Sequence, residues 1–181
     1  MWNKGLSYRE RHGLINTHKN VRNKLNTDKN TSNHSLGLVF FPAFDWKISE
    51  THPERQERLL YTRDQIVEEG LLDIPNIVEY NPIVADWDTI ERVHVGAPNL
   101  ESWVTEAHRV SAGGAIAAAD AVMRGEVDRA FALVRPPGHH AMSMVYGIRG
   151  FCTINIEAVM IQHMRQTYGI KRVAVWKYWP S

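Results

Sequence analysis

Short apolar runs alternate with helical patterns after residue 35, and this alternation constrains the fold more than any other feature of the sequence. The expected strands cover residues 36–41, 76–82, 130–134 and 171–175, and the expected helices cover residues 51–69, 86–94, 105–125 and 155–168. Strands that alternate with helices indicate β-α units. We therefore expect an α/β fold with a mostly parallel sheet.

Local signals predict where these helices begin and end. Thr51 and Glu54 have the spacing of a capping box, and Asp86 can cap the short helix that follows it. Helices are expected to stop at Gly70, Gly125 and Gly169. Gly113 and Gly114 lie inside a helical pattern, where glycine lowers helix propensity, so we expect close packing of the helix backbone against the sheet.

The composition is that of a soluble globular protein with one domain. The chain has 181 residues, of which 44% are hydrophobic and 23% charged. The sequence contains neither an apolar run of membrane-spanning length nor the apolar core of a signal peptide. The single cysteine, Cys152, excludes an internal disulfide framework and fits a reducing compartment. We therefore expect a cytoplasmic protein without membrane contacts.

Residues 1–35 form a basic, polar segment. They contain seven Lys or Arg residues against two acidic ones, a net charge of +5, so the remainder sums to −4 because the whole chain carries +1. A basic segment of this kind could bind nucleic acid or an anionic surface. However, "NKLNTDKNTSNHS" has no apolar periodicity to offset the entropy of ordering. We expect a disordered tail, with nucleic-acid binding the less favoured interpretation.

The stretch "RPPGHH", residues 135–140, follows the expected strand at 130–134. In parallel sheets, working groups occupy loops at the carboxyl ends of strands. Neighbouring side chains in a strand point to opposite faces, so an irregular turn is needed to aim both histidines at one place. We predict a turn centred on Pro137 and Gly138, with the glycine at positive φ.

The paired imidazoles of His139 and His140 suit proton transfer, because imidazole titrates near neutral pH. Two rings are too few for a closed zinc site, and the other histidines show no metal-ligand spacing. A hydrogen-bonded pair in the core is the structural alternative.

Four stretches occur together and in order: "HPERQERL", "SAGGAIAAADAV", "FALVRPPGHHA" and "RGFCTINIEAV". In this respect the sequence resembles histone deacetylase-like zinc amidohydrolases of the arginase–deacetylase superfamily. The resemblance implies a three-layer α-β-α fold. It also implies hydrolysis of acetylated lysine or polyamine amides by a zinc-bound water.

The resemblance also implies roles for individual residues. His140 would be the main general base and acid, and His139 would assist it. Gly150 and Phe151 match positions that line the acyl-lysine tunnel, where the aromatic ring would hold the aliphatic stem. Arg58 is the candidate for an arginine beside a product-exit channel.

The C-terminal part departs from the family pattern. Relatives carry a metal-binding aspartate and histidine directly after the strand that residues 171–175 resemble. Here residues 176–181 read "WKYWPS", and no Asp or His follows His163. We therefore name no metal ligand, although zinc is expected for the family.

This departure gives three expectations about the chain. Residues 36–175 are interpreted as the N-terminal part of a deacetylase domain, and residues 176–181 as a tail foreign to the family. A truncation or a shifted reading frame would explain that tail. The chain by itself is expected to be inactive. The alternative is a pseudoenzyme that binds acyl-lysine-type ligands without turnover. Neither the substrate nor the oligomeric state can be read from the sequence.

Overall fold

The computed structural model describes residues 34–94, 106–143 and 150–176. The expected disordered tail thus lies, apart from His34 and Ser35, outside the described residues, as do Thr105 of the expected helix at 105–125 and residues 177–181. Residues 34–181 form one compact unit by their internal contacts. Among the described residues, no helix is both long and apolar enough to cross a membrane.

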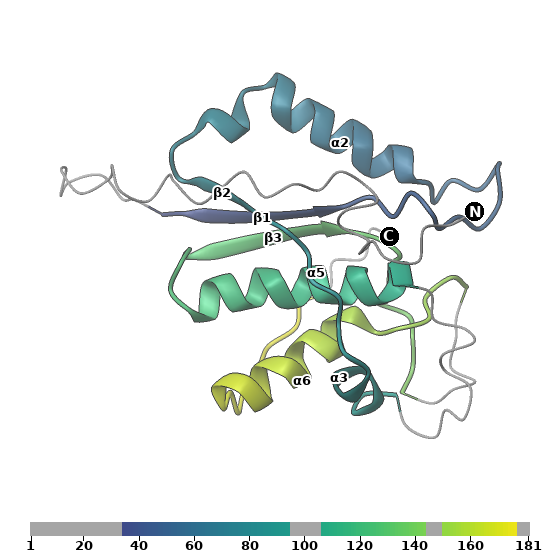
Figure 1. Ribbon diagram of the computed structural model, residues 1–181, viewed down its shortest axis with the longest axis vertical. Helices are drawn as coiled ribbons and strands as arrows, with labels where there is room; N and C mark the ends of the chain where they lie inside the picture. Colours follow the sequence, from purple (N-terminus) through teal and green to yellow (C-terminus); the bar gives the residue numbers. More distant parts are fainter. Residues whose placement is uncertain (1–33, 95–105, 144–149, 177–181) are drawn as a thin grey trace, which may run out of the picture. The chain divides into compact units, whose positions relative to one another are not determined.

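A three-stranded parallel sheet lies at the centre of this unit (Figure 1). Its strands are β1 (Leu36–Phe41), β2 (Ile77–Tyr80) and β3 (Arg129–Val134), in the order β2-β1-β3. β1 pairs with β2 from Leu36↔Ile77 and with β3 over its full length. The expected strands at 36–41, 76–82 and 130–134 are therefore confirmed, with shifts of one to two residues at their ends.

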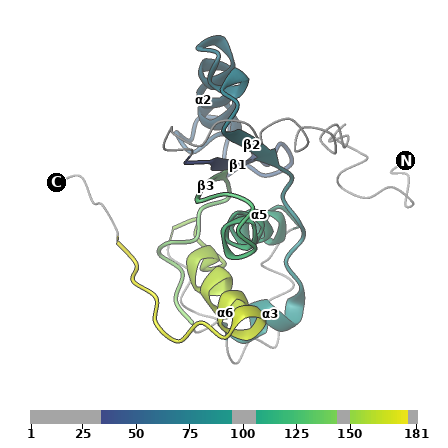
Figure 2. The same cartoon turned by 90° about the vertical axis from the view of Figure 1, so that its left-hand side faces the viewer.

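Helices cover both faces of the sheet, as the α/β assignment requires. α2 (Gln56–Glu68) lies on one face, and α5 (Glu106–Met123) packs on β1 and β3 from the other (Figures 1 and 2). α6 (Ile156–Tyr168) packs on the outer side of α5, next to the short α3 (Trp87–Glu91). A 3-10 turn, η2 (Leu71–Asp73), connects α2 to β2.

Two apolar clusters hold α5 in place. On the sheet side, Val39 packs with Ala117 and Ala118, and the half-buried side chains of β3 join them. On the other side, Ile116 packs with Ile90 of α3 and Val159 of α6. α5 is therefore buried along most of its length, which accounts for its alanine-rich sequence: small side chains allow close approach on both sides.

The two glycines inside α5 confirm the predicted close packing. A Cβ on Gly114 would lie 2.7 Å from Cγ1 of Val134 in the sheet. A Cβ on Gly113 would lie 2.0 Å from the carbonyl oxygen of Ile83, so this glycine admits the chain that leads to α3 and not the sheet itself. In both places the absence of a side chain permits a backbone contact.

Most helix ends follow the local signals, with one exception. Asp86 caps α3 by accepting a hydrogen bond from the Thr89 N–H at 2.6 Å, and Gly169 ends α6 at a φ of 69°. The capping box of Thr51 and Glu54 is wrong: α2 begins at Gln56, after an Arg55 that makes no side-chain cap. Glu54 is instead buried and bonded to arginines, as described below.

One expectation about the sheet is wrong. The described residues 171–175 form no strand; they run extended and exposed after α6, because no neighbouring strand pairs with them. Their apolar run, Val173 to Val175, is compatible with a strand, but a strand forms only where a sheet edge accepts its hydrogen bonds.

Candidate active site

The carboxyl ends of β1 and β3 bring two chain segments together. The Arg135 N–H donates to the Phe41 carbonyl at 3.2 Å, so the loop after β3 starts beside the loop after β1. Because parallel strands end at the same edge, side chains from both loops gather there. The loop at residues 135–141, which carries the two predicted histidines, therefore lies next to residues 42–54.

His139 and His140 occupy the centre of a turn. The Ala141 N–H donates to the Gly138 carbonyl at 3.0 Å, which closes a four-residue turn with the two histidines at its middle positions. Their ring centroids lie 4.1 Å apart with an interplanar angle of 64°. His139 is half-buried and His140 is exposed. The prediction that the loop presents both rings together is confirmed.

The predicted turn centred on Pro137 and Gly138, with the glycine at positive φ, is wrong: the observed turn is centred on His139 and His140. The described glycines with positive φ are Gly70, Gly125, Gly150 and Gly169. A Cβ on Gly138 would instead lie 2.0 Å from the carbonyl oxygen of Ile154 and 2.7 Å from the amide nitrogen of Ile156. Gly138 is therefore constrained by the close passage of the segment before α6 and not by its own backbone angle.

Asn155, the N-cap of α6, holds this turn in place through its hydrogen bonds. Its side-chain oxygen accepts from the Ala158 N–H at 3.0 Å, and its side-chain amide donates to the Ala141 carbonyl at 2.9 Å. Its own N–H donates to Nε2 of the buried His94 at 3.0 Å. Burial lowers the pKa of His94, which keeps Nε2 available as an acceptor. One asparagine thus joins the helix, the turn and a buried ring.

Arg135 anchors the other end of the loop. The side chain is 1% exposed, and its Nε donates to Oε1 of Glu54 at 2.9 Å. The guanidinium also donates to the carbonyls of Pro42, Ala43 and Trp46, at 2.6, 2.9 and 3.2 Å. Because a planar guanidinium carries five N–H donors, one side chain can tie the β1 loop to the β3 loop. The peptide bond that follows, Arg135–Pro136, is cis.

Aromatic rings line the same region. The ring of Phe151 lies 5.1 Å from that of His52 in a T-shaped contact and 6.5 Å from that of Trp46. Trp46 in turn contacts the ring of His108, at the start of α5, at 5.5 Å. Burial lowers the pKa of His108 to about 4, so this imidazole is neutral at physiological pH.

The remaining site residues fall at the edges of this region. Gly150 is exposed, with a φ of 60° and open space where a side chain would be. Arg58 lies on α2 with 59% of its side chain exposed and forms an ion pair with Glu54. It is thereby connected to Arg135 through one carboxylate.

Cys152 joins the two histidines. Its thiol is buried, and its sulfur lies with a ring nitrogen of His139 and one of His140 in a group whose atoms are all within 4.8 Å of one another. This grouping was missed from the sequence. Arg135, Trp46 and His52 were missed as well. The available signal was an arginine directly after a buried strand.

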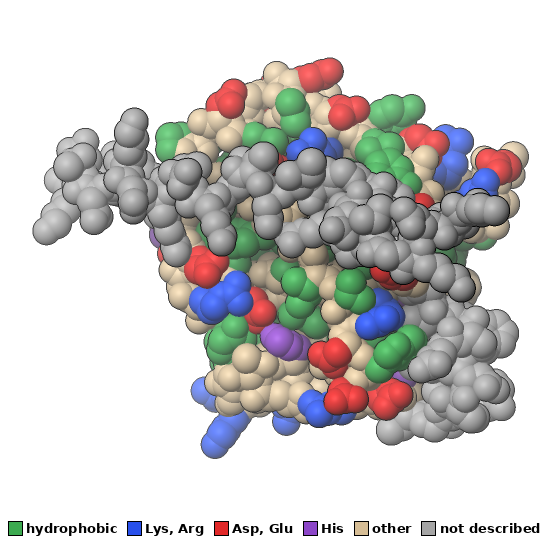
Figure 3. Space-filling model, in the orientation of Figure 1, with side chains coloured by type: hydrophobic (Ala, Val, Ile, Leu, Met, Phe, Trp, Pro, Cys, Tyr) green, Lys and Arg blue, Asp and Glu red, His purple; other side chains and the backbone are tan. Residues whose placement is uncertain are grey.

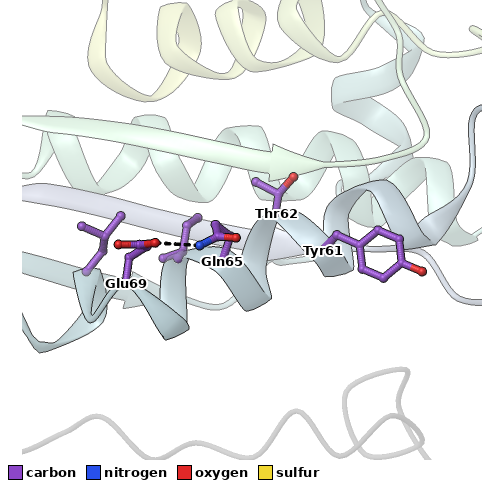
Figure 4. Close-up of a pocket in the computed structure, with 6 residues that line it drawn as sticks. Tyr61, Thr62, Gln65 and Glu69 are labelled. Carbon is purple, nitrogen blue, oxygen red and sulfur yellow. Dashed lines mark hydrogen bonds between the residues drawn. The ribbon is translucent and has the colours of Figure 1, made fainter.

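A hollow lies along α2 and is lined by none of the residues of the histidine turn. Figure 4 shows it along α2, lined by Tyr61, Thr62, Gln65, Ile66, Glu69 and Leu71, with a volume of about 410 Å³. The Gln65 side chain donates to Glu69 within it at 2.8 Å. No histidine or cysteine lines it, so it offers no proton-transfer pair. On the face shown in Figure 3, acidic and basic side chains of the described residues are interspersed.

Comparisons with known proteins find similarity to deacetylases. Residues 97–176 match the family described as "Histone deacetylase domain". The chain is 35% identical to a "Probable deacetylase" of Archaeoglobus fulgidus, over 77% of this chain and 43% of that protein. It is 29% identical to mouse "Polyamine deacetylase HDAC10", over 72% of this chain and 23% of that protein.

The fold has a solved counterpart. The crystal structure of the HDA15 HD domain superposes with a TM-score of 0.62 at 23% identity, over 74% of this chain and 44% of that one. The fold is therefore the α/β fold of deacetylase domains. The chain belongs to the histone deacetylase family over the part that these comparisons cover. It spans less than half the length of these relatives.

Proposed function

We propose that this chain carries the proton-transfer half of the active site of a zinc-dependent deacetylase. The substrate class is an N-acetylated amine, either a lysine side chain or a polyamine. The observation that supports this most is the histidine turn at the carboxyl end of β3, with ring centroids 4.1 Å apart. The family match and the name of the polyamine deacetylase relative support the reaction and substrate class.

In this proposal the two imidazoles divide the proton chemistry. A ring nitrogen of the exposed His140 takes a proton from the attacking water and returns one to the leaving amine. His139, half-buried beside it, assists by stabilising the charge that develops on its neighbour. Asn155, through the Ala141 carbonyl, keeps the turn in the geometry that this exchange requires.

Phe151, Gly150 and Arg58 have proposed roles around this pair. Phe151 and the edge-on ring of His52 form an apolar wall that suits the methylene stem of lysine or a polyamine. Gly150, with open space at its Cα, leaves room for a substrate backbone. Arg58 remains the candidate for the product channel.

The hydrolytic zinc ion is not accommodated by the described residues. The cluster around the turn offers two imidazoles and a thiol, without a carboxylate, and its imidazoles are the proposed proton carriers. Family members hold zinc through aspartate and histidine, and no Asp or His follows His163 here. We therefore propose that the 181-residue polypeptide alone does not hydrolyse acetyl amides.

Two experiments test this proposal. The 181-residue polypeptide, supplied with zinc and an acetyl-lysine peptide or an acetylpolyamine, should release no acetate; zinc-dependent release would contradict the proposed inactivity. Next, the coding DNA beyond the Val175 codon should be read in all three frames. If one frame encodes an Asp-x-His segment and a later tyrosine, a chain extended in that frame should deacetylate, and His140→Ala should abolish turnover.

Failure of that extended chain to deacetylate would favour binding without turnover. The aromatic wall of Phe151, His52 and Trp46 is the observation behind this second candidate. An acetyl-lysine peptide should then bind the folded chain and lose affinity on Phe151→Ala. Equal affinity of the variant for the peptide would exclude this second candidate function.

We also propose a cytoplasmic location for the protein.

A further inference from the structure

The cluster of His139, His140 and Cys152 has a donor set that the proposed hydrolysis does not use in full. The hydrolytic proposal assigns work to both imidazoles but none to the thiol. Yet the three donor atoms, two ring nitrogens and one sulfur, all lie within 4.8 Å of one another. Two come from the turn after β3, and the third from the segment just before α6.

We propose that this cluster is a binding site for a thiophilic divalent cation such as Zn²⁺, separate from the hydrolytic metal. Imidazole nitrogen and thiolate sulfur are the ligands that zinc takes in proteins. Carboxylate-binding ions such as Mg²⁺ and Ca²⁺ are excluded as occupants by the same donor set. A three-ligand protein site leaves a fourth position for water, which suits a cluster with one exposed member.

The geometry requires only a small closure. With metal–nitrogen bonds of about 2.0 Å and a metal–sulfur bond of about 2.3 Å, tetrahedral ligands lie roughly 3.3–3.6 Å apart. The observed spread of up to 4.8 Å must therefore contract by about 1 Å. Cys152 is 1% exposed and held by its packing, whereas His140 is exposed on a turn, so the contraction falls mainly on the His140 ring. The movement falls on the side chain that can make it.

Coordination changes the protonation of the site. The Cys152 thiol loses its proton to solvent as the metal–sulfur bond forms, and each histidine binds through a neutral ring nitrogen. An ion held in this way occupies the nitrogens that the proposed proton transfer needs. The site would therefore act as an inhibitory metal site in a deacetylating chain, although the binding itself does not depend on the proposed function.

The test uses Co²⁺ as a spectroscopic probe of the full 181-residue chain. A thiolate bound to Co²⁺ produces a near-ultraviolet charge-transfer band. Because Cys152 is the single cysteine in the sequence, such a band reports on this residue alone. We expect the band to appear at stoichiometric Co²⁺, to disappear on addition of Zn²⁺, and to be absent in Cys152→Ser.

Histidine variants separate the proposed site from a cysteine that binds metal with other partners. His139→Asn and His140→Asn should each weaken Co²⁺ binding at least about tenfold, since each removes one of three ligands. His34→Gln changes an exposed histidine outside the cluster and should leave binding unchanged. Circular dichroism should confirm that each variant folds. If Cys152→Ser does not fold, the histidine variants, which change residues on an exposed turn, still test the proposal.

Two results would overturn the proposal. One is the absence of a charge-transfer band from the folded chain, which would show that the thiol does not bind the ion. The other is a band of unchanged affinity in the His139→Asn, His140→Asn double variant, which would place the cysteine in a different ligand set.

Discussion

Two arginines bind the two oxygens of one carboxylate, and they do so in opposite surroundings. Arg135 reaches Oε1 of Glu54 from the loop after β3 with 1% of its side chain exposed. Arg58 reaches Oε2 from α2 with 59% of its side chain exposed. The buried contact continues into three backbone carbonyls, whereas the exposed one competes with water. The same chemical pair should therefore contribute very differently to stability on its two sides.

The largest effect should come from the buried side. Arg135→Met should lower the free energy of unfolding by about 3–5 kcal/mol, because it leaves Oε1 of Glu54 and the carbonyls of Pro42, Ala43 and Trp46 buried without their donor. Urea denaturation followed by circular dichroism measures this. Arg135→Lys keeps the charge but not the planar guanidinium, so its loss in the free energy of unfolding should be smaller than that of Arg135→Met but still measurable. A loss below about 1 kcal/mol for the methionine variant would show that the buried network is dispensable.

Backbone contacts in the same region come next. Gly138→Ala should cost about 3 kcal/mol, because its Cβ would meet the Ile154 carbonyl oxygen at 2.0 Å and a backbone atom cannot rotate away. Gly125→Ala is the matched control: its φ is 66°, but nothing lies within 4 Å of its Cβ. It should cost only the left-handed strain of about 1–2 kcal/mol. Equal losses in urea denaturation would remove the steric argument for Gly138.

The contrast between local and distant contacts also explains what the sequence could predict. The Asp86 cap and the Gly169 stop depend on residues within one helical turn, so their side-chain types were sufficient. The contact between Arg135 and Glu54 joins residues 81 positions apart. Because Glu54 pairs with Arg135, it does not form the predicted capping box with Thr51. No residue near Thr51 in the sequence indicates this distant contact.

The candidate site divides in the same way. A strand followed by "RPPGHH" was enough to predict that both histidines share one loop end. Gly138 was assigned to a positive φ because its constraint, the passing carbonyl of Ile154, comes from a segment 16 residues later. The grouping of Cys152 with the two histidines was missed for the same reason. Residues 171–175 contain a short apolar run that suits a strand, but the edge that would pair with them is not set by their own sequence.

Burial should also make stability depend on pH through His108. Its pKa falls from 6.5 in the unfolded chain to about 4 in the folded one, because burial disfavours the charged ring. Below pH 6.5 the unfolded state takes up a proton that the folded state refuses, so stability is lost as the pH falls from 6.5 to about 4. The loss at pH 5 should be about 2 kcal/mol.

Urea denaturation at pH 7.5 and pH 5 measures this loss. His108→Phe keeps a ring against Trp46 and removes the titration. The difference in the free energy of unfolding between pH 7.5 and pH 5 should therefore shrink by most of the loss assigned to His108. His94, whose pKa is also lowered by burial, accounts for a remainder of the same sign. An unchanged difference in His108→Phe would contradict the assignment.

A half-exposed contact should contribute less. Asp86→Ala removes the side-chain oxygen that accepts from the Thr89 N–H and should cost about 1 kcal/mol. Hydrogen bonding to Thr89 lowers the pKa of this carboxyl, so the contribution is present above pH 3.8 and is lost as the pH falls below it. Asp88→Ala, which removes an exposed acid from the same first turn, should cost less than half as much in the same denaturation experiment. A larger effect at Asp88 would assign the stabilisation to charge at the helix end and not to the cap.

The smallest effect should come from the exposed arginine with which the comparison began. Arg58→Gln should change the free energy of unfolding by at most about 1 kcal/mol, because water can replace its contact with Glu54 while Arg135 still pairs with the other oxygen. The double variant with Arg135→Met tests this directly. If the two sides are independent, the losses add; if Arg58 compensates for a missing Arg135, the double variant loses more than the sum. A single-variant loss approaching that of Arg135→Met would mean that exposure does not govern the strength of these two contacts.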